Sequence, residues 1–460
     1  MSASMDRYII AGGLAVSASG QTPANLVIED GRITEWVGDP GGSDLPVFDA
    51  GGHIMLPGLI DAHTHFHMAG GDTFTVDDFA YGGRLAASAG VTSVIDFIEP
   101  APAGDLAEAI ETRFRDVAGC PVDYQFHLVI PKRFAGRPDW PELIDRYGLA
   151  AVKGFTTYRE DGLCLDEEDL RHLLAWALRQ AGPLTVHAED DGLLERVKNE
   201  LGRAERRDMS FFPQSRPAET EQLAVRKLLV LAGAAPVYFV HISTEKALAN
   251  TMAARLSRPE RPLWVETCPQ YLVLDQSLYG QEAALYTVCP PLRTPEDQKA
   301  LWAGIRSGSV DVVASDHCAY TPEMKTGSTW QETRPGLPAV DAILPVLVNE
   351  GVRQGRIGWE DLVRVTAENP ARIFRLNGKG SLTPGSDADL VLISRSELAI
   401  TEGSVFPAGE PAMPSRAGYA PFTARHLRRP WLRHVIRRGE FLVRAGKVQD
   451  GLGQGSFIHC

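Results

Sequence analysis

The stretch Ile54-Met-Leu-Pro-Gly-Leu-Ile-Asp-Ala-His-Thr-His65 is an apolar run that ends in two histidines, His63 and His65. In an extended chain, side chains two positions apart point to the same side, so both imidazoles could bind one metal ion. In a chain with 12 histidines, such a pair taken alone is more often a hydrogen-bonded or surface pair. Its interpretation therefore depends on the polar residues that follow.

Four further polar residues lie within or at the end of apolar segments, and they are Lys153, His187, His241 and Asp316. Each has an ordinary structural explanation when it is considered alone. The histidines could be core residues, the lysine a buried stem or a partner of Glu99 or Asp96, and the aspartate a helix cap before Thr321-Pro322. Their arrival at successive strand ends argues for one common site.

Short apolar strands alternate with helix-like stretches through most of the chain, which is typical of a parallel sheet built from βα units. Eight such strands are expected, at 54–63, 91–97, 123–129, 150–155, 183–188, 237–242, 263–267 and 310–316. Eight is the number that closes a (β/α)8 barrel. The fold class predicted is therefore α/β, with a TIM-type barrel.

The two ends of the chain carry a different pattern, with period-two alternation around turn signals. Asp30-Gly31 between apolar segments predicts a hairpin, and strand-like runs return at 389–393 and 435–443. We expect both ends to build one small β-sandwich domain together. The predicted boundaries are 1–56 and 384–460 for this domain and 57–383 for the barrel.

The loops and helices of the barrel have readable ends. An apolar stripe after Asp166 predicts a helix that Gly182 can terminate, and Thr294-Pro295-Glu296-Asp297 predicts the capped start of another. The long connections at 199–220 and 320–339 are predicted to be loops over the active face.

Composition excludes several classes of protein. The net charge of -13 argues against a nucleic-acid surface, and no run of about 18 apolar residues or N-terminal leader is found, so neither a membrane span nor export is expected. The six cysteines form no regular framework, which favours free thiols in a reducing cytoplasm.

In a barrel, catalytic groups lie at the C-terminal ends of the strands, so the six polar residues should converge on one mouth. Four imidazoles and a carboxylate suit Zn²⁺ or a similar divalent ion, and they exceed what one tetrahedral site uses. Two ions are therefore expected, about 3.5–4 Å apart and sharing a nucleophilic hydroxide. Asp316 would take the proton of this hydroxide and deliver it to the leaving nitrogen.

Lys153 is the unusual member of the set, because an ammonium beside two cations is repelled and burial favours the neutral amine. A neutral amine can add carbon dioxide to form a carbamate, which would bridge the two metals. We therefore expect carbon dioxide, bound as this carbamate, to belong to the site.

The chain resembles the cyclic amidohydrolases (dihydropyrimidinase, hydantoinase and allantoinase) over nearly its whole length. The motifs that carry the resemblance are Pro57-Gly-Leu-Ile-Asp-Ala-His-Thr-His65, Lys153 to Tyr158, His187-Ala-Glu189, Ser215-Arg-Pro217, Cys268-Pro-Gln-Tyr271, Pro290-Pro-Leu-Arg293 and Ser315-Asp-His-Cys318. The resemblance implies that His63, His65, carboxylated Lys153, His187, His241 and Asp316 hold two metals. It also implies that the Tyr158 hydroxyl stabilises the oxyanion.

Substrate-binding positions depart from the hydantoinase pattern, since Cys289 replaces the usual serine and Pro335 lies near the position of the usual asparagine. The resemblance implies ring opening of a hydantoin, dihydropyrimidine or similar cyclic ureide or imide to an N-carbamoyl acid. The alternatives are an allantoinase, an enzyme for acyclic amides and a non-catalytic scaffold. A homodimer or homotetramer is implied, and the arginine-rich segment 421–460 is either a subunit contact or a solvated basic face.

Overall fold

The computed structural model describes residues 7–180, 182–280, 282–327, 329–399 and 413–460. The other residues include 1–6, where we expect no leader, and these lie outside the described part. Within the described part, no helix is both long and apolar enough to cross a membrane.

Eight parallel strands follow one another around a sheet in chain order, which confirms the predicted barrel. An isolated parallel bridge between Thr64 and His317 joins the segment after the last strand to the first strand. The strands are β6 (Leu59–Thr64), β9 (Val91–Ile98), β10 (Asp123–Val129), β11 (Ala151–Phe155), β12 (Leu184–His187), β13 (Val237–Phe239), β14 (Leu263–Thr267) and β15 (Val312–Val313).

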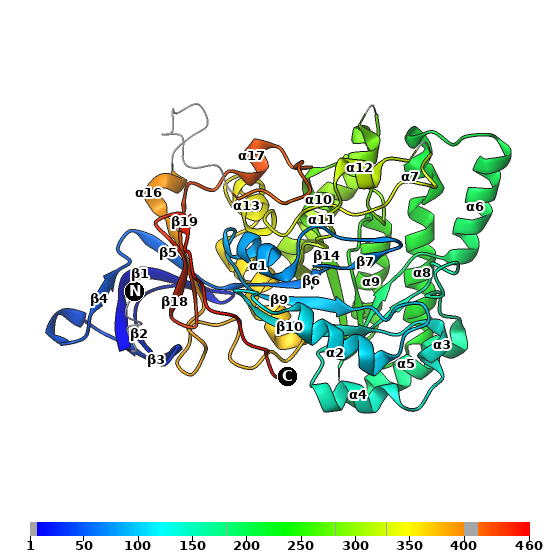
Figure 1. The fold of residues 1–460 in the computed structure, drawn as a ribbon. Helices are drawn as coiled ribbons and strands as arrows, with labels where there is room; N and C mark the ends of the chain where they lie inside the picture. Colours follow the sequence, from blue (N-terminus) through cyan, green and yellow to red (C-terminus); the bar gives the residue numbers. More distant parts are fainter. Residues whose placement is uncertain (1–6, 181, 281, 328, 400–412) are drawn as a thin grey trace.

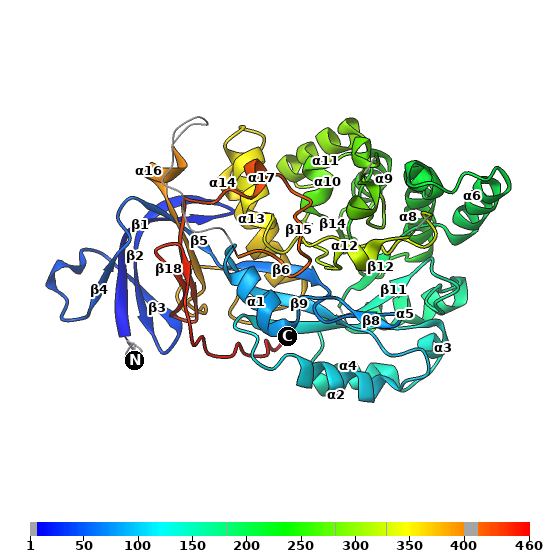
Figure 2. The same cartoon turned by 45° about the horizontal axis from the view of Figure 1, so that its top comes forward.

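Helices cover the outside of this sheet, and Figure 2 shows α2 and α4 on one side with α9 and α11 on the opposite side. The main helices are α1 (Phe79–Ala87), α2 (Leu106–Asp116), α4 (Trp140–Tyr147), α5 (Glu167–Gln180), α6 (Asp191–Arg203), α8 (Ala218–Leu231), α9 (Glu245–Ser257) and α11 (Pro295–Ser307). Shorter ones are α3 (Lys132–Ala135), α7 (Phe212–Ser215), α10 (Pro269–Val273), α12 (Pro322–Lys325), α13 (Ile343–Val346), α14 (Trp359–Val363), α15 (Asn369–Ile373), α16 (Arg395–Leu398) and α17 (Ala424–Leu427). Two π-helical segments, η5 (Leu347–Val352) and η6 (Arg364–Glu368), continue α13 and α14.

The predicted helix starts agree with the structure. α5 covers the expected apolar stripe, and α11 begins after Thr294, whose side chain accepts a hydrogen bond from the Asp297 amide. The capping hydroxyl satisfies an amide that the first helical turn leaves without a partner.

A second sheet unites the two ends of the chain, as expected, and Figure 1 shows the blue N-terminal strands beside the red C-terminal ones. It is a mixed sheet of nine strands in which β5 joins the N-terminal strands to β16. The strands are β1 (Arg7–Ser17), β2 (Gly20–Glu29), β3 (Arg32–Val37), β4 (Val47–Asp49), β5 (His53–Pro57), β16 (Leu390–Ser394), β17 (Leu432–Arg437), β18 (Glu440–Arg444) and β19 (Lys447–Val448). The pair β7 (Ala69–Gly70) and β8 (Thr73–Phe74) forms a separate hairpin.

Asp30-Gly31 forms the predicted tight turn, because Glu29 and Arg32 are paired across β2 and β3. Tyr8 and Ile28 from the N-terminal strands pack in one core with Leu390 and Ile436 from the C-terminal strands. The two ends therefore depend on each other for burial of their apolar faces.

Several expectations about element bounds are wrong. The strand expected at 54–63 is two strands, because β5 belongs to the mixed sheet and β6 to the barrel. Gly58 between them passes so close to Thr92 that a Cβ there would lie 2.2 Å from the threonine Oγ1. The expected loop at 199–220 contains the end of α6, all of α7 and the start of α8, and the loop expected at 320–339 contains α12. The strands expected at 237–242 and 310–316 end earlier, so His241 and Asp316 lie on the loops that follow β13 and β15.

The barrel is filled by side chains of its strands, among them Ile60, Ile95, Tyr238 and Val312, which pack with Phe374. This packing makes the inside of the barrel a core and restricts a site to its ends.

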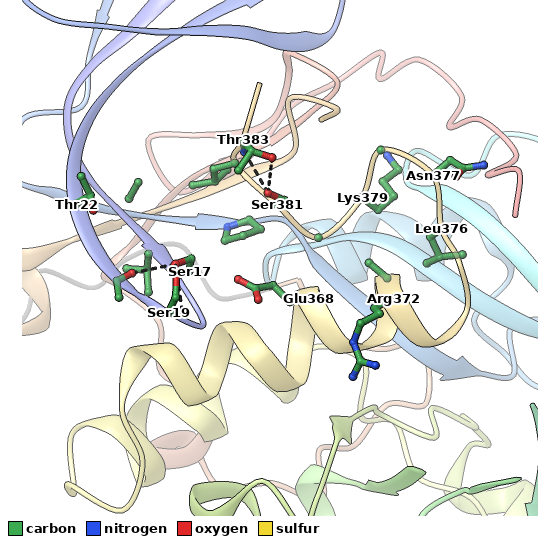
Figure 3. A pocket seen from close by; sticks show the side chains of 18 of the residues that line it. Ser17, Ser19, Thr22, Glu368, Arg372, Leu376, Asn377, Lys379, Ser381 and Thr383 are labelled. Atoms are coloured by element: carbon green, nitrogen blue, oxygen red, sulfur yellow. Dashed lines mark hydrogen bonds between the residues drawn. The ribbon is translucent and has the colours of Figure 1, made fainter. Parts of the chain in front are cut away.

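A pocket of about 700 Å³ lies at the junction of the two sheets (Figure 3). Glu368 lies there between the turn that carries Ser17 and the segment that carries Ser381, and its carboxylate accepts a hydrogen bond from the Ala18 amide at 2.7 Å. None of the predicted site residues lines this pocket.

Candidate metal centre

Six polar side chains from five strand ends meet at one end of the barrel, as the sequence predicts. His63 lies in β6 and His65 just after it, Lys153 lies in β11, and His187 ends β12. All of the six except His65 are at most 9% exposed. Groups of this polarity are buried at a cost, so a common partner is expected.

His63, His65 and Asp316 form the first cluster. The Nε2 atoms of His63 and His65 lie 3.2 Å and 3.4 Å from the same Asp316 oxygen, Oδ1. One ligand atom from each residue lies within 4.8 Å of the other two, which fits a single cation. Asp316 does not cap the helix after Thr321, because Thr321 itself accepts the hydrogen bond from the Met324 amide. The capping alternative is therefore wrong.

His187 and His241 form the second cluster, with Nδ1 of His187 3.0 Å from Nε2 of His241. Nε2 of His187 contacts the Glu189 carboxylate at 2.8 Å, which leaves Nδ1 to face the other imidazole. Burial lowers the pKa of both histidines, so both are neutral and offer lone pairs. Neutral imidazoles that converge on one point suit a divalent ion.

Lys153 lies between the two clusters. Its Nζ is 5.0 Å from the centre of the Phe97 ring, which packs against His63 and His65, and 5.1 Å from the Phe155 ring, which packs against His187. A group attached to this nitrogen would therefore face both clusters.

The environment of Lys153 favours its neutral amine. Burial lowers the pKa of Lys153 to about 8, although Glu266 and Asp316 oppose this effect. Within the described residues, no acidic oxygen lies within 4.0 Å of the amine, because Asp96 pairs with Arg113 and Glu99 lies beside His65. The alternative of an ion pair to Glu99 or Asp96 is therefore wrong.

Glu266 is a residue of this site that the sequence analysis did not identify. It is fully buried and its Oε1 contacts Nδ1 of His63 at 2.7 Å and the His241 amide at 2.9 Å. The Tyr238 hydroxyl donates to its other oxygen at 2.7 Å, and burial raises the pKa of Glu266 to about 8. Its signal in the sequence is a single carboxylate inside the apolar run 263–267.

Arg216 and Glu189 form a second group that the sequence analysis named only as part of motifs. The Arg216 guanidinium donates to the Glu189 carboxylate at 2.5 Å and lies 5.1 Å from the centre of the Tyr158 ring. Burial opposes ionisation of Glu189, but Arg216 and His187 lower its pKa to about 2. Arg216 thus links the His187 cluster to Tyr158.

Tyr158 lies beside the second cluster, with its ring centre 5.1 Å from that of His187. Its side chain interacts with Cys289, so the structure brings these two predicted residues together. Tyr158, His241 and Asp316 all have positive φ angles, of 66°, 39° and 52°. Such strained conformations in non-glycine residues concentrate at functional sites.

Pro335 is exposed and lies in the segment that follows α12. Its neighbour Gly336 donates its amide to the Thr287 carbonyl at 2.9 Å, which places the segment next to the one that carries Cys289.

Five arginines of the arginine-rich segment 421–460 pair with acidic side chains of the same chain. Arg425, Arg429, Arg433, Arg437 and Arg438 each lie within 4.0 Å of an acidic side chain.

Comparisons with known proteins agree with this geometry. The sequence profile described as "Amidohydrolase family" matches residues 54–406. D-phenylhydantoinase of Escherichia coli K12 is 34% identical over 467 residues, covering 98% of each chain. Two solved structures are similar to this chain, each with a TM-score of 0.85 and 28% identity. They are dihydropyrimidinase from Brevibacillus agri and D-hydantoinase from Bacillus sp. AR9. Both comparisons cover 98% of this chain and 98% of the other.

Proposed function

This chain belongs to the amidohydrolase family, and we propose from that premise that it is a metal-dependent hydrolase that opens a cyclic amide. Its substrate would be a hydantoin, a dihydropyrimidine or a similar cyclic ureide or imide, and its product a ureido acid. The observation that carries the proposal is the convergence of six metal-binding side chains at one end of the barrel. The relatives named above are hydantoinases and a dihydropyrimidinase, so allantoinase is not favoured.

The donor set fits two divalent ions, for which Zn²⁺ is our proposal because imidazole and carboxylate ligands suit it. His63, His65 and Asp316 would hold one ion, His187 and His241 the other, and Lys153 as a carbamate would be shared. The bound ions would supply a hydroxide nucleophile near neutral pH and polarise the scissile carbonyl.

The remaining chemistry belongs to the side chains. Asp316 would accept a proton as the carbonyl is attacked and return it to the nitrogen as the C–N bond breaks. The Tyr158 hydroxyl would donate to the developing oxyanion, and burial supports this role because it raises the pKa of Tyr158 and keeps its proton in place. Cys289 and the segment of Pro335 would bind the ring, mainly through backbone groups.

A substrate panel tests the proposal. Zinc-loaded enzyme would be incubated with hydantoin, both enantiomers of 5-phenylhydantoin, dihydrouracil, allantoin and a linear N-acyl amide, and ring opening would be followed by loss of the ring absorbance and by product analysis. The proposed function would be supported by activity on the hydantoins or dihydrouracil, provided that this activity is lost both with a chelator and in Lys153→Ala. If only allantoin were hydrolysed, the protein would be an allantoinase. If only the linear amide were hydrolysed, it would be an enzyme for acyclic amides. A protein that purifies without metal would point to a scaffold.

Three further statements are also proposals. We expect a homodimer or homotetramer, a reducing cytoplasmic location and a division of the chain at 56/57 and 383/384. All six cysteines are free, which supports the location. Light scattering, cell fractionation and limited proteolysis would test the three in turn.

A further inference from the structure

Lys325 is a buried lysine close to the predicted substrate-binding segments. It ends the short helix α12 and is fully buried. Its Nζ donates to the carbonyls of Thr287 at 3.1 Å, Arg334 at 3.0 Å and Gly336 at 2.6 Å. An ammonium has three N–H donors, so these three carbonyls use them all.

The three carbonyls belong to two separate segments of the chain. Thr287 lies two residues before Cys289, and Arg334 and Gly336 flank Pro335. The two segments also contact each other, because the Gly336 amide donates to the Thr287 carbonyl at 2.9 Å and the Thr287 hydroxyl to the Arg334 carbonyl at 3.1 Å. Lys325 thus holds both segments that carry the predicted ring-binding positions.

These segments adjoin the catalytic side chains on two sides. Cys289 interacts with Tyr158, as described above. Gly336 packs so tightly against the Cys318 backbone, two residues after Asp316, that a Cβ there would lie 2.6 Å from the Cys318 carbonyl oxygen. A shift of either segment would therefore reach the substrate position.

The three buried carbonyls around Lys325 require a hydrogen-bond donor between them. Three carbonyl dipoles that point at one buried site repel each other unless a donor lies between them, and a buried cation is costly unless its donors are satisfied. No acidic side chain of the described residues lies within ion-pair distance of Lys325, and burial lowers its pKa to about 7, so its side chain is held by the hydrogen bonds to the three carbonyls. An apolar residue here would leave the Gly336 carbonyl without the donor that it has now, and would take one of two donors each from the carbonyls of Thr287 and Arg334.

We propose that Lys325 is a positioning residue that fixes the segments 287–289 and 334–336 in the geometry that binds the cyclic substrate. The part of this proposal that concerns substrate rests on the proposed function. The fixing of the two segments by the lysine does not depend on the reaction.

The test compares Lys325→Met with wild type and with Lys379→Met. Lys379 is the control, because it is also buried and is bonded to Asp123, Asp387 and Asp389, but it lines the pocket at the junction of the two sheets, which none of the predicted site residues lines. Lys325→Gln, which keeps two N–H donors, is measured alongside, so that the comparison does not depend on recovery of the Met variant. Each protein is assayed for zinc per chain, for hydrogen exchange at the Gly336 amide, and for kcat and KM with hydantoin.

For Lys325→Met we expect the zinc content of wild type. Because the variant lacks the hydrogen bonds from Nζ to the carbonyls, we expect hydrogen exchange at the Gly336 amide to be about tenfold faster. For the same reason we expect KM to be about tenfold higher, with a smaller change in kcat. The exchange rate and KM of Lys325→Gln should lie between those of wild type and Lys325→Met. Lys379→Met should lose thermal stability, but its exchange rate at Gly336 and its KM should be those of wild type. Unchanged exchange at Gly336 and an unchanged KM in a folded Lys325 variant would overturn the proposal. If wild type opens no ring, the proposed function fails, and the exchange data still decide whether Lys325 fixes the two segments.

Discussion

The Glu266 carboxylate lies 2.7 Å from Nδ1 of His63, and this contact fixes which nitrogen of the histidine faces the Asp316 carboxylate. With Nδ1 turned toward Glu266, Nε2 is the nitrogen that lies 3.2 Å from Oδ1 of Asp316. Glu266 also accepts the His241 amide, so one carboxylate orients a residue of each cluster. Carboxylates that orient metal-binding histidines in this way raise the basicity of the ligand.

We therefore expect Glu266→Gln to lower the zinc affinity of the chain about 10- to 100-fold, because an amide polarises the imidazole less than a carboxylate does. Competition titration with a chromogenic chelator would measure this change. Glu350→Gln is the control, since Glu350 is also buried but pairs with Arg356 and Arg425. Equal zinc affinities for both variants would contradict the role assigned to Glu266.

The activation of the metal-free enzyme should depend on pH through Lys153. Because only the neutral amine adds carbon dioxide, and burial lowers the pKa of Lys153 to about 8, the reactive fraction rises about tenfold per pH unit below pH 8 and levels above it. The initial rate of activity recovery with zinc at fixed dissolved carbon dioxide, measured from pH 6.5 to pH 10, would show this profile. A rate that still climbs tenfold per unit above pH 9 would place the amine near the pKa of a free lysine, about 10.4.

The sequence predicts the barrel and the convergence of the six polar residues because both depend on local patterns. Polar residues such as His187 and Asp316 are unusual at the ends of apolar strands, and a parallel barrel brings all strand ends to one mouth. The division of 54–63 into two strands could not be predicted, because β5 pairs with β1 and β16 whereas β6 pairs with β9, and the local pattern does not show this change of partners.

The supporting residues were not predictable for a related reason. Glu266 and His63 are 203 residues apart, and one glutamate in an apolar strand does not indicate its partner. Arg216 lies in a segment expected to be a loop, and its contact with Tyr158 depends on how that segment packs. Side chains that orient other side chains leave no spacing pattern in the sequence.

Removal of Arg216 should affect both stability and catalysis. In Arg216→Met, Glu189 would keep His187 as a partner but lose its buried counter-charge, which costs about 3–5 kcal/mol, and Tyr158 would lose the cation over its ring. We expect a lower denaturation midpoint and a kcat reduced at least about tenfold, the equivalent of 1.4 kcal/mol.

Arg159→Met provides the matched control for this variant. Arg159 follows Tyr158 directly and pairs with Asp191 at 2.8 Å, but its side chain is 69% exposed, so its ion pair contributes little. Urea unfolding and steady-state kinetics of both variants would separate the effects. If Arg216→Met matched Arg159→Met in kcat, Arg216 would have no part in positioning Tyr158.

Asp316 and Asp311 lie at opposite ends of one strand, β15, and should differ in what they contribute. Asp316 follows the strand at the metal-binding end, whereas Asp311 precedes it, pairs with Arg255 and accepts the Val265 amide at 2.8 Å. Because an asparagine cannot carry the proton, Asp316→Asn should lower kcat about 10²- to 10⁴-fold. Asp311→Asn should lower the free energy of unfolding and leave kcat nearly unchanged, as expected for the N-terminal end of a barrel strand.

Steady-state kinetics and urea unfolding of the two variants, both loaded with zinc, would check this contrast. A kcat for Asp316→Asn within about threefold of wild type would remove Asp316 from the proton transfer, since a general base contributes far more than that.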